Sequence, residues 1–305
     1  MSRKYIIVGV ILAIVLLIIL SIGAAILLAI GGVSTGNIAK IDIEGVLVLH
    51  PEDRGLFTET LGVEDYIEAL DRAEKDPNVK AVILRVNSPG GEVIASEKLA
   101  RKIKEVAEKK PVVAYVETMG TSGAYMAIAP ATCIVAEKHA IVGSIGVRLD
   151  MIQYYELMRK VGVNVTVIKA GKYKDMGSPY RPLTPEEREY LERIVKEIYM
   201  DFVKWVAENR NMTLEETLKV ADGKIYSGGD AKKVGLVDYV GTEKDALEMA
   251  QKLANISNPV IVDYTPAKYP EIFNFMSQLT YTLGYGIGRG LSDRGIETYI
   301  YPPST

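Results

Sequence analysis

Two residue types that commonly build reactive sites are scarce in this chain of 305 residues. It contains one cysteine, Cys133, and two histidines, His50 and His139. A single cysteine excludes an intrachain disulfide and a cysteine-based metal cluster, and two histidines argue against a zinc site built from imidazoles. We therefore expect the protein to use no metal ion and no organic cofactor.

Positive charge is slightly outnumbered, by 39 acidic to 36 basic residues. The formal net charge is −3, and lysine and arginine do not gather into a basic stripe. Proteins that bind nucleic acid neutralise phosphates with clustered lysine and arginine, so we expect no nucleic-acid partner. The apolar share of 48% is enough to bury a sizeable core in a chain of this length, which excludes a disordered protein.

Charge is missing altogether from residues 5–33, which follow Arg3 and Lys4. As a helix this segment would be about 43 Å long, more than the roughly 30 Å hydrocarbon core of a bilayer. A cleaved signal peptide has a much shorter apolar stretch, so the length favours one uncleaved N-terminal transmembrane helix. The positive-inside rule predicts that residues 1–4 stay in the cytoplasm and that the following domain lies outside it.

The remaining chain alternates short β-branched runs with longer amphipathic stretches, a pattern typical of an α/β fold with a mostly parallel sheet. After a linker at 34–37, we predict one domain over 38–262 and a C-terminal extension over 263–305. The predicted strands are 38–49, 79–86, 111–116, 133–136, 163–168 and 260–264. The predicted helices are 63–75, 92–109, 122–129, 150–160, a long one over 184–209 with a capping box at Thr184, and a short one with the same device at Thr213.

Two glycine-rich loops follow predicted strands and precede predicted helices. The loop at 87–91 reads NSPGG, and its glycines allow the backbone to approach a ligand closely. The loop at 118–125 reads TMGTSGAY and would expose the hydroxyl of Ser122 beside the N–H groups that open a helix. Such a turn suits a nucleophile whose tetrahedral adduct needs oxyanion stabilisation, although a serine in such a turn can also serve only as a helix cap.

A serine nucleophile needs a base, and neither histidine is well placed for this role. His50 ends the first predicted strand and His139 follows charged residues in a polar turn. The alternative is a lysine, whose ordinary pKa of ~10.4 means that a neutral side chain near pH 7 costs roughly 4 to 5 kcal/mol. Lys172 and Lys174 both lie in the loop after the predicted strand 163–168, and the pattern alone does not choose between them.

Four motifs in order resemble the signal peptide peptidase A (protease IV) family: NSPGG at 87–91, TSGAY at 121–125, GSIGV at 143–147 and GKYKD at 171–175. The resemblance spans about residues 38–262. It implies a Clp-protease/crotonase-like fold with repeated ββα and βα units, and a membrane-anchored serine endopeptidase. The family often has Gly-Gly after the serine where this chain has Gly123-Ala124, and alanine is compatible with the start of a helix.

The resemblance also implies a role for each matching site residue. Ser122 matches the nucleophile and Lys174 the general base, while Ser144 matches the serine that orients the lysine. The N–H groups of Gly91 and Gly123 match the oxyanion hole. Single-module members of the family resemble ring assemblies in which the serine of one subunit meets the lysine of the next, so a homo-oligomer is expected.

The expected substrates are cleaved signal peptides and other short or unfolded polypeptides, met at the cell membrane by an extracytoplasmic domain. Three other functions are compatible with the motifs. A related membrane-bound Ser/Lys peptidase would act on one specific membrane protein partner, a crotonase-like enzyme would act on acyl-CoA, and a membrane scaffold would have no activity. Labelling of Ser122 by a fluorophosphonate would separate the peptidases from the last two.

Overall fold

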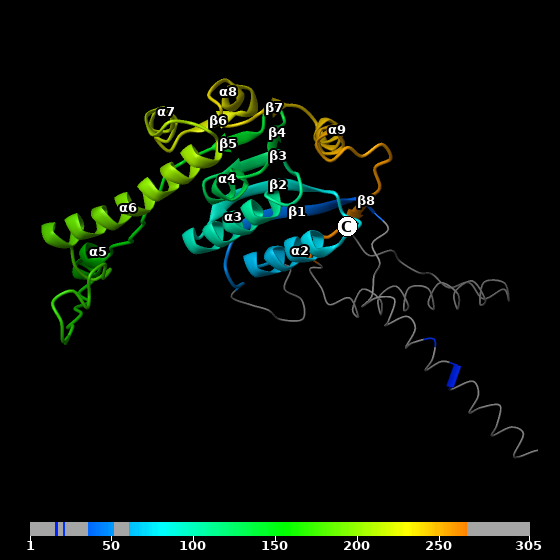
Figure 1. Ribbon diagram of the computed structural model, residues 1–305. Helices are drawn as coiled ribbons and strands as arrows, with labels where there is room; N and C mark the ends of the chain where they lie inside the picture. The colour runs from blue at the N-terminus through cyan, green and yellow to red at the C-terminus, as the bar shows by residue number, and fades with distance from the viewer. Residues whose placement is uncertain (1–15, 18–20, 22–35, 52–60, 267–305) are drawn as a thin grey trace, which may run out of the picture.

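The computed structural model describes residues 16–17, 21, 36–51 and 61–266 (Figure 1). Within these residues, no helix is both long enough and apolar enough to cross a membrane. Apart from Leu16, Leu17 and Ser21, the predicted anchor at 5–33 lies outside the described part. Residues 267–305, nearly all of the predicted C-terminal extension, lie outside it too.

A mixed sheet of eight strands forms the centre of the described chain, which confirms the predicted α/β fold. Its main path has the order β6-β5-β3-β2-β1-β8, and β4 pairs with β3 and β7. All pairs are parallel except β5 with β6. The strands are β1 (Ile38–Leu47), β2 (Ala81–Gly91), β3 (Val112–Thr121), β4 (Cys133–Ala136), β5 (Ile141–Gly143), β6 (Ile225–Ser227), β7 (Tyr239–Val240) and β8 (Ile261–Asp263).

Helices cover both faces of this sheet (Figure 1). Alternate residues along β1 point to opposite faces, so Ile41 and Ile43 join the core under α2, α3 and α4, whereas Ile38 joins a smaller cluster with Ala246 and Ala250 of α9. The helices are α2 (Val63–Lys75), α3 (Val93–Ala107), α4 (Gly123–Ile128), α5 (Tyr155–Lys160), α6 (Pro185–Asn209), α7 (Leu214–Val220), α8 (Gly228–Lys233) and α9 (Glu243–Ala254).

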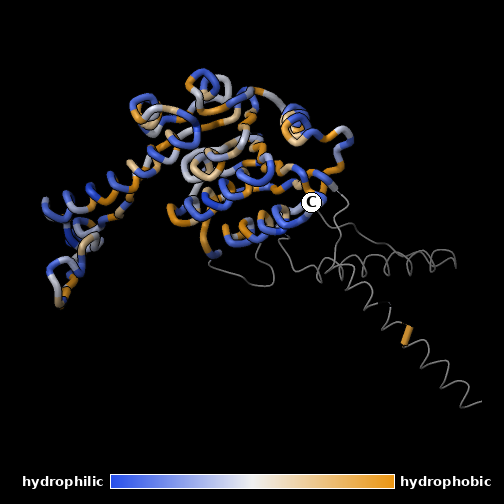
Figure 2. Tube along the Cα trace, in the orientation of Figure 1, coloured by the Kyte–Doolittle hydropathy of each residue, from blue (hydrophilic) through white to orange (hydrophobic). Residues whose placement is uncertain are grey.

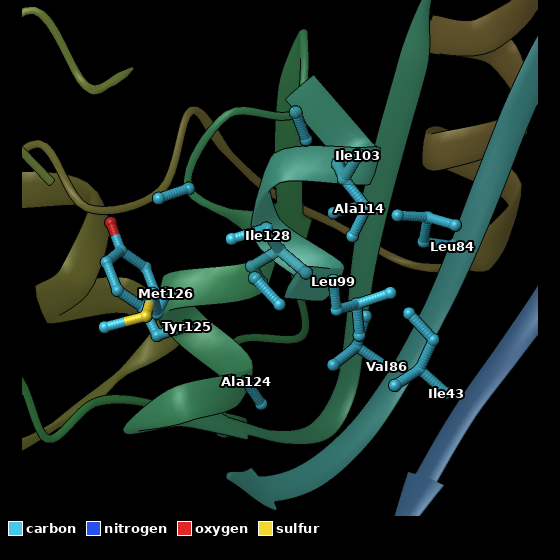
Figure 3. Packing of buried hydrophobic residues seen from close by; sticks show 14 of the residues in the cluster. Ile43, Leu84, Val86, Leu99, Ile103, Ala114, Ala124, Tyr125, Met126 and Ile128 are labelled. Atoms are coloured by element: carbon cyan, nitrogen blue, oxygen red, sulfur yellow. The ribbon is translucent and has the colours of Figure 1, made fainter. Parts of the chain in front are cut away.

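The main core includes α4, the short helix that follows Ser122. Leu84, Val86 and Ala114 on the sheet meet Leu99 of α3 and Ile128 of α4 (Figure 3), and all five side chains are buried. Along α2 and α3, hydrophilic and hydrophobic positions alternate at helical spacing (Figure 2). The apolar side of each helix therefore packs on the sheet, and this fixes the position of α4.

Residues 146–201 form an arm that projects from this body, with α5 at the far end of α6 (Figure 1). The capping box that predicted the start of α6 is present, since the hydroxyl of Thr184 accepts the N–H of Glu187 and the Glu187 carboxylate accepts the N–H of Thr184. The same device starts α7 at Thr213. The buried apolar side chains of α6 are confined to its C-terminal half, at Phe202, Val203 and Val206.

Four sequence predictions need correction. Residues 163–168 form no strand, because no other segment of the described chain pairs with them, and α5 begins at Tyr155 rather than at 150. The NSPGG motif is not a loop: β2 continues through it and pairs Gly90 with Val46 after an irregularity in β1. Likewise β3 continues to Thr121 because β5, which was not predicted, pairs with its last residues.

Candidate active site

Ser122 lies at the point where β3 ends and α4 begins. Its backbone has φ 53° and ψ −125°, a conformation that L-residues adopt rarely, and its N–H donates to the carbonyl of Gly143 at 2.8 Å. The side chain makes no capping hydrogen bond to α4, although a helix cap was the ordinary interpretation of this serine. A strained turn held in place by a neighbouring strand is typical of a functional position.

Ser144 occupies the equivalent position on the adjacent strand. Thr121 at the end of β3 pairs with Gly143 at the end of β5, so the residue that follows each strand is a serine. Ser144 also has a positive φ, 51°, and its N–H donates to the carbonyl of Lys224 at 2.9 Å. Parallel pairing thus brings together two serines that are far apart in the sequence.

The glycines of both motifs are needed because the backbones of β1, β2 and the start of α4 come close together here. A Cβ on Gly90, which has φ 91°, would lie 2.6 Å from the backbone nitrogen of Gly123, and a Cβ on Gly91 would lie 2.0 Å from the carbonyl oxygen of Leu47. A Cβ on Gly123 would lie 2.0 Å from the hydroxyl of Ser96 and 3.3 Å from the backbone nitrogen of Gly91. Gly123 is also the first residue of α4, so its N–H has no partner within the helix.

These residues line one pocket of about 810 Å³. Gly91, Ser122, Gly123 and Ser144 all contribute to it, so four of the five predicted site residues come together. The other lining residues come from elements spread over the whole domain: Val46, Pro89, Gly90, Val93, Ser96, Met126, Gly146, Val147, Arg148, Ile198, Tyr199, Phe202, Ala221, Asp222 and Gly223.

The fifth predicted residue, Lys174, does not line this pocket. It is exposed in the loop between α5 and α6, at the far end of the arm, where its N–H donates to the carbonyl of Gly171. The other candidate, Lys172, binds the carboxylate of Glu186 instead, and this hydrogen bond raises the pKa of Lys172. Among the described residues, no lysine and no histidine lines the pocket of Ser122.

Sequence reasoning missed several residues of the pocket. Ser96 of α3 supports Gly123 from below, and its hydroxyl donates to the carbonyl of Glu92 at 2.8 Å. Tyr199 and Phe202 come from α6, and Arg148 and Asp222 contribute charge. No local pattern marks these residues, because they meet the site only through the packing of distant elements.

The serine and the backbone N–H groups of the pocket are suited to acyl transfer. No group of three or more metal-ligating side chains occurs in the part of the chain that the structure describes. A strained serine beside backbone N–H groups is the arrangement with which serine hydrolases attack a carbonyl and bind the resulting oxyanion. The α/β fold and the pocket are therefore compatible with a hydrolase of the serine type.

Comparison with known proteins gives the family. The model of peptidase family S49 matches residues 104–257. The chain is 65% identical over 228 residues to a candidate protease of Methanocaldococcus jannaschii, covering 75% of this chain and 72% of that protein. It is also 38% identical to the chloroplastic serine protease SPPA of Arabidopsis thaliana, over 63% of this chain and 29% of that protein. Protease 4 of Salmonella typhi is 34% identical, over 72% of this chain and 35% of that protein.

The protein belongs to peptidase family S49, the family of signal peptide peptidase A and protease IV. The resemblance found in the four sequence motifs is therefore confirmed. The homologues support a serine peptidase.

Proposed function

We propose that the protein is a membrane-anchored serine endopeptidase that uses Ser122 as nucleophile and Lys174 as general base. The conformation of Ser122, with φ 53° inside a pocket shared with Gly91, Gly123 and Ser144, is the observation that carries this proposal. Neutral Lys174 takes the proton from the Ser122 hydroxyl as its oxygen attacks a peptide carbonyl. The N–H groups of Gly91 and Gly123 stabilise the oxyanion.

The second half of the reaction follows from the same groups. Protonated Lys174 gives its proton to the leaving amine, and the acyl group stays on Ser122 until water hydrolyses the ester. The hydroxyl of Ser144 lies in the same pocket and orients the lysine. Because a lysine must lose its proton before it can act as a base, the rate should rise through alkaline pH. With a histidine base, the rate would instead level off near pH 7.

The base is supplied by a second copy of the chain. Lys174 is exposed at the far end of the arm, and the pocket of Ser122 contains no lysine among the described residues. The arm also exposes apolar side chains that a neighbouring subunit would cover: Leu149, Ile152, Leu157, Val161, Val163, Val165, Val167 and Ile168. Residues 163–168 alternate as a strand does, yet pair with nothing in the described part of one chain, which suits pairing between copies.

The substrates that fit this site are cleaved signal peptides and other short or unfolded polypeptides. Only an extended chain can lie with its backbone against the Gly90–Gly91 end of β2, and Met126 and Phe202 give the pocket an apolar wall. The charge-free segment 5–33 would anchor the protein in the cell membrane and keep the catalytic domain on the outer side. Substrate remnants left in the bilayer would then lie close to the site.

The deciding experiment mixes two inactive variants of the full chain in detergent. Ser122→Ala and Lys174→Ala should each abolish peptide hydrolysis when purified alone. If subunits of the two variants are allowed to exchange, about a quarter of the interfaces will combine an intact serine with an intact lysine, and activity should return to that level. Continued inactivity of the mixture would place both residues of the dyad in one chain. Full activity of either variant alone would exclude the dyad itself.

A further inference from the structure

The arm that carries Lys174 has almost no core of its own. Between Ile145 and Phe202, a single residue is buried, and it is a carboxylate, Glu187, at 3% exposure. Beside two exposed aromatic pairs, Tyr154 with Tyr180 and Tyr173 with Tyr190, the loop at 169–181 therefore owes its conformation to polar contacts. Such contacts must be numerous to hold a loop against its conformational entropy.

One guanidinium supplies most of them. Arg181 donates to both carboxylate oxygens of Asp175, at 2.9 Å from Nε and 2.8 Å from Nη2, and to both oxygens of Glu187, at 2.8 Å from Nη1 and 2.6 Å from Nη2. It also donates to the backbone carbonyls of Asp175 and Pro182, at 3.2 and 3.0 Å. Two bidentate pairs on one planar fork fix the orientation of all three side chains.

The cluster holds the loop close to Lys174. Asp175 follows Lys174 directly, and Lys169 reaches across the loop to the Asp175 carboxylate and to the carbonyl of Lys172. At the other end, Glu187 belongs to the capping box of α6 through its hydrogen bond with the N–H of Thr184. The loop is thus fixed to the first turn of the helix that forms the stem of the arm.

The charges of the cluster balance, with Arg181 and Lys169 facing Asp175 and Glu187. The hydrogen bonds from Arg181 hold the pKa of Asp175 and of Glu187 well below the usual range. A carboxylate with a lowered pKa stabilises the folded arrangement at all pH values above its unfolded pKa near 4, and this contribution is lost only as the pH falls through the lowered value. The cluster therefore stays intact throughout the alkaline range that a lysine base needs.

We propose that Arg181 is a positioning residue for the peptidase reaction: through Asp175 and Glu187 it locks the loop at 169–181 onto α6, so that Lys174 is presented to the serine of the acylation site in one orientation. The proposal rests on the proposed role of Lys174 as base. Catalytic groups lose much of their effect when they move by about 1 Å. Breaking the hydrogen bonds of Arg181 to Asp175 and Glu187 should consequently lower the rate of acylation without changing how substrate binds.

The test uses the full chain in detergent and three variants. Arg181→Lys keeps the charge but cannot form two bidentate pairs, and we expect kcat to fall at least tenfold with KM changed less than twofold. Labelling of Ser122 by a fluorophosphonate should slow in parallel. Arg181→Ala should lose more activity and recover part of it when millimolar guanidinium is added. Arg159→Ala is the matched control, because Arg159 forms an exposed ion pair with Glu156 on the same arm and should leave kcat unchanged.

Each outcome separates this proposal from the dyad on which it rests. If Lys174→Ala is inactive but Arg181→Lys keeps full activity, the positioning role is wrong and the dyad stands. If Lys174→Ala keeps activity, the dyad and the positioning role both fall. If Arg181→Lys loses activity only because its oligomer dissociates, as judged by mass in detergent, Arg181 has a structural role and the proposal is overturned.

Discussion

At the scale of single residues, two serines of the site have strained backbone conformations. Ser122 and Ser144 both have φ near 50°, and they follow the paired residues Thr121 and Gly143 at the ends of adjacent strands. A non-glycine residue in this region costs about 1–3 kcal/mol. Two such residues side by side persist only because the paired strands and helix α4 over-determine their conformation, and both residues line one pocket.

The strain at Ser122 can be measured by substitution. Ser122→Gly should be more stable than Ser122→Ala by about 1 kcal/mol, because glycine accepts φ 53° freely and this gain exceeds its cost of roughly 0.5–1 kcal/mol in chain entropy. Thermal unfolding would show a difference of roughly 2–4 °C in midpoint for a domain of this size. Both variants should be inactive. A less stable glycine variant would mean that the turn is not strained.

At the scale of elements, α6 joins two parts of different character. Its C-terminal half is attached to α4, since the indole N–H of Trp205 donates to the carbonyl of Met126 at 3.0 Å and Phe202 packs in the same core. Arg210 follows the last residue of α6, and its buried guanidinium forms an ion pair with Asp238 at 2.6 Å. The N-terminal half carries the exposed loop of Lys174, so α6 sets the direction in which the arm points.

Removing the charge of Asp238 should loosen this attachment. Asp238 also accepts the N–H of Ile134 in β4, and Asp238→Asn would leave Arg210, whose Nε already has no hydrogen-bond partner, buried without its counter-ion. We expect a loss of about 2–3 kcal/mol in the free energy of unfolding, measured by urea titration. The control is Asp201→Asn on the same helix, which breaks only an exposed pair with Lys204 and should change stability by less than about 0.5 kcal/mol. Equal losses in the two variants would contradict the role given to Arg210.

At the scale of the whole molecule, the sequence predicted correctly those helix boundaries that residues close together in the chain determine. The helix at 63–75 and the capping boxes at Thr184 and Thr213 were correct to the residue, because the side chains that define them are neighbours in the chain. Strand β5 and the continuation of β2 through Gly91 were missed, because pairing with distant strands creates them. Motif resemblance identified four residues that share the pocket, but the exposed position of Lys174 depends on the direction of α6, which no local pattern encodes.

The integrity of the whole domain can be followed through its one cysteine. Cys133 begins β4 in the core, and burial raises the pKa of its thiol to about 12. At pH 8 an ordinary thiol with a pKa of ~8.5 is about one quarter thiolate, whereas a thiol with a pKa of 12 is ionised in about one molecule in ten thousand. Native protein should therefore react with iodoacetamide at least about a thousandfold more slowly than unfolded protein in urea.

A second thiol provides the reference rate for this measurement. In the variant Glu189→Cys, the added thiol lies on the exposed part of α6 and should react at the rate of a free cysteine while Cys133 in the same molecule stays protected. Because the pKa of Cys133 is raised in the folded state, its contribution to stability is complete below the unfolded value near 8.5 and declines as the pH rises toward 12. Protection should thus hold at pH 8 and weaken in strongly alkaline solution, and rapid native alkylation at pH 8 would show that β4 opens without unfolding of the sheet.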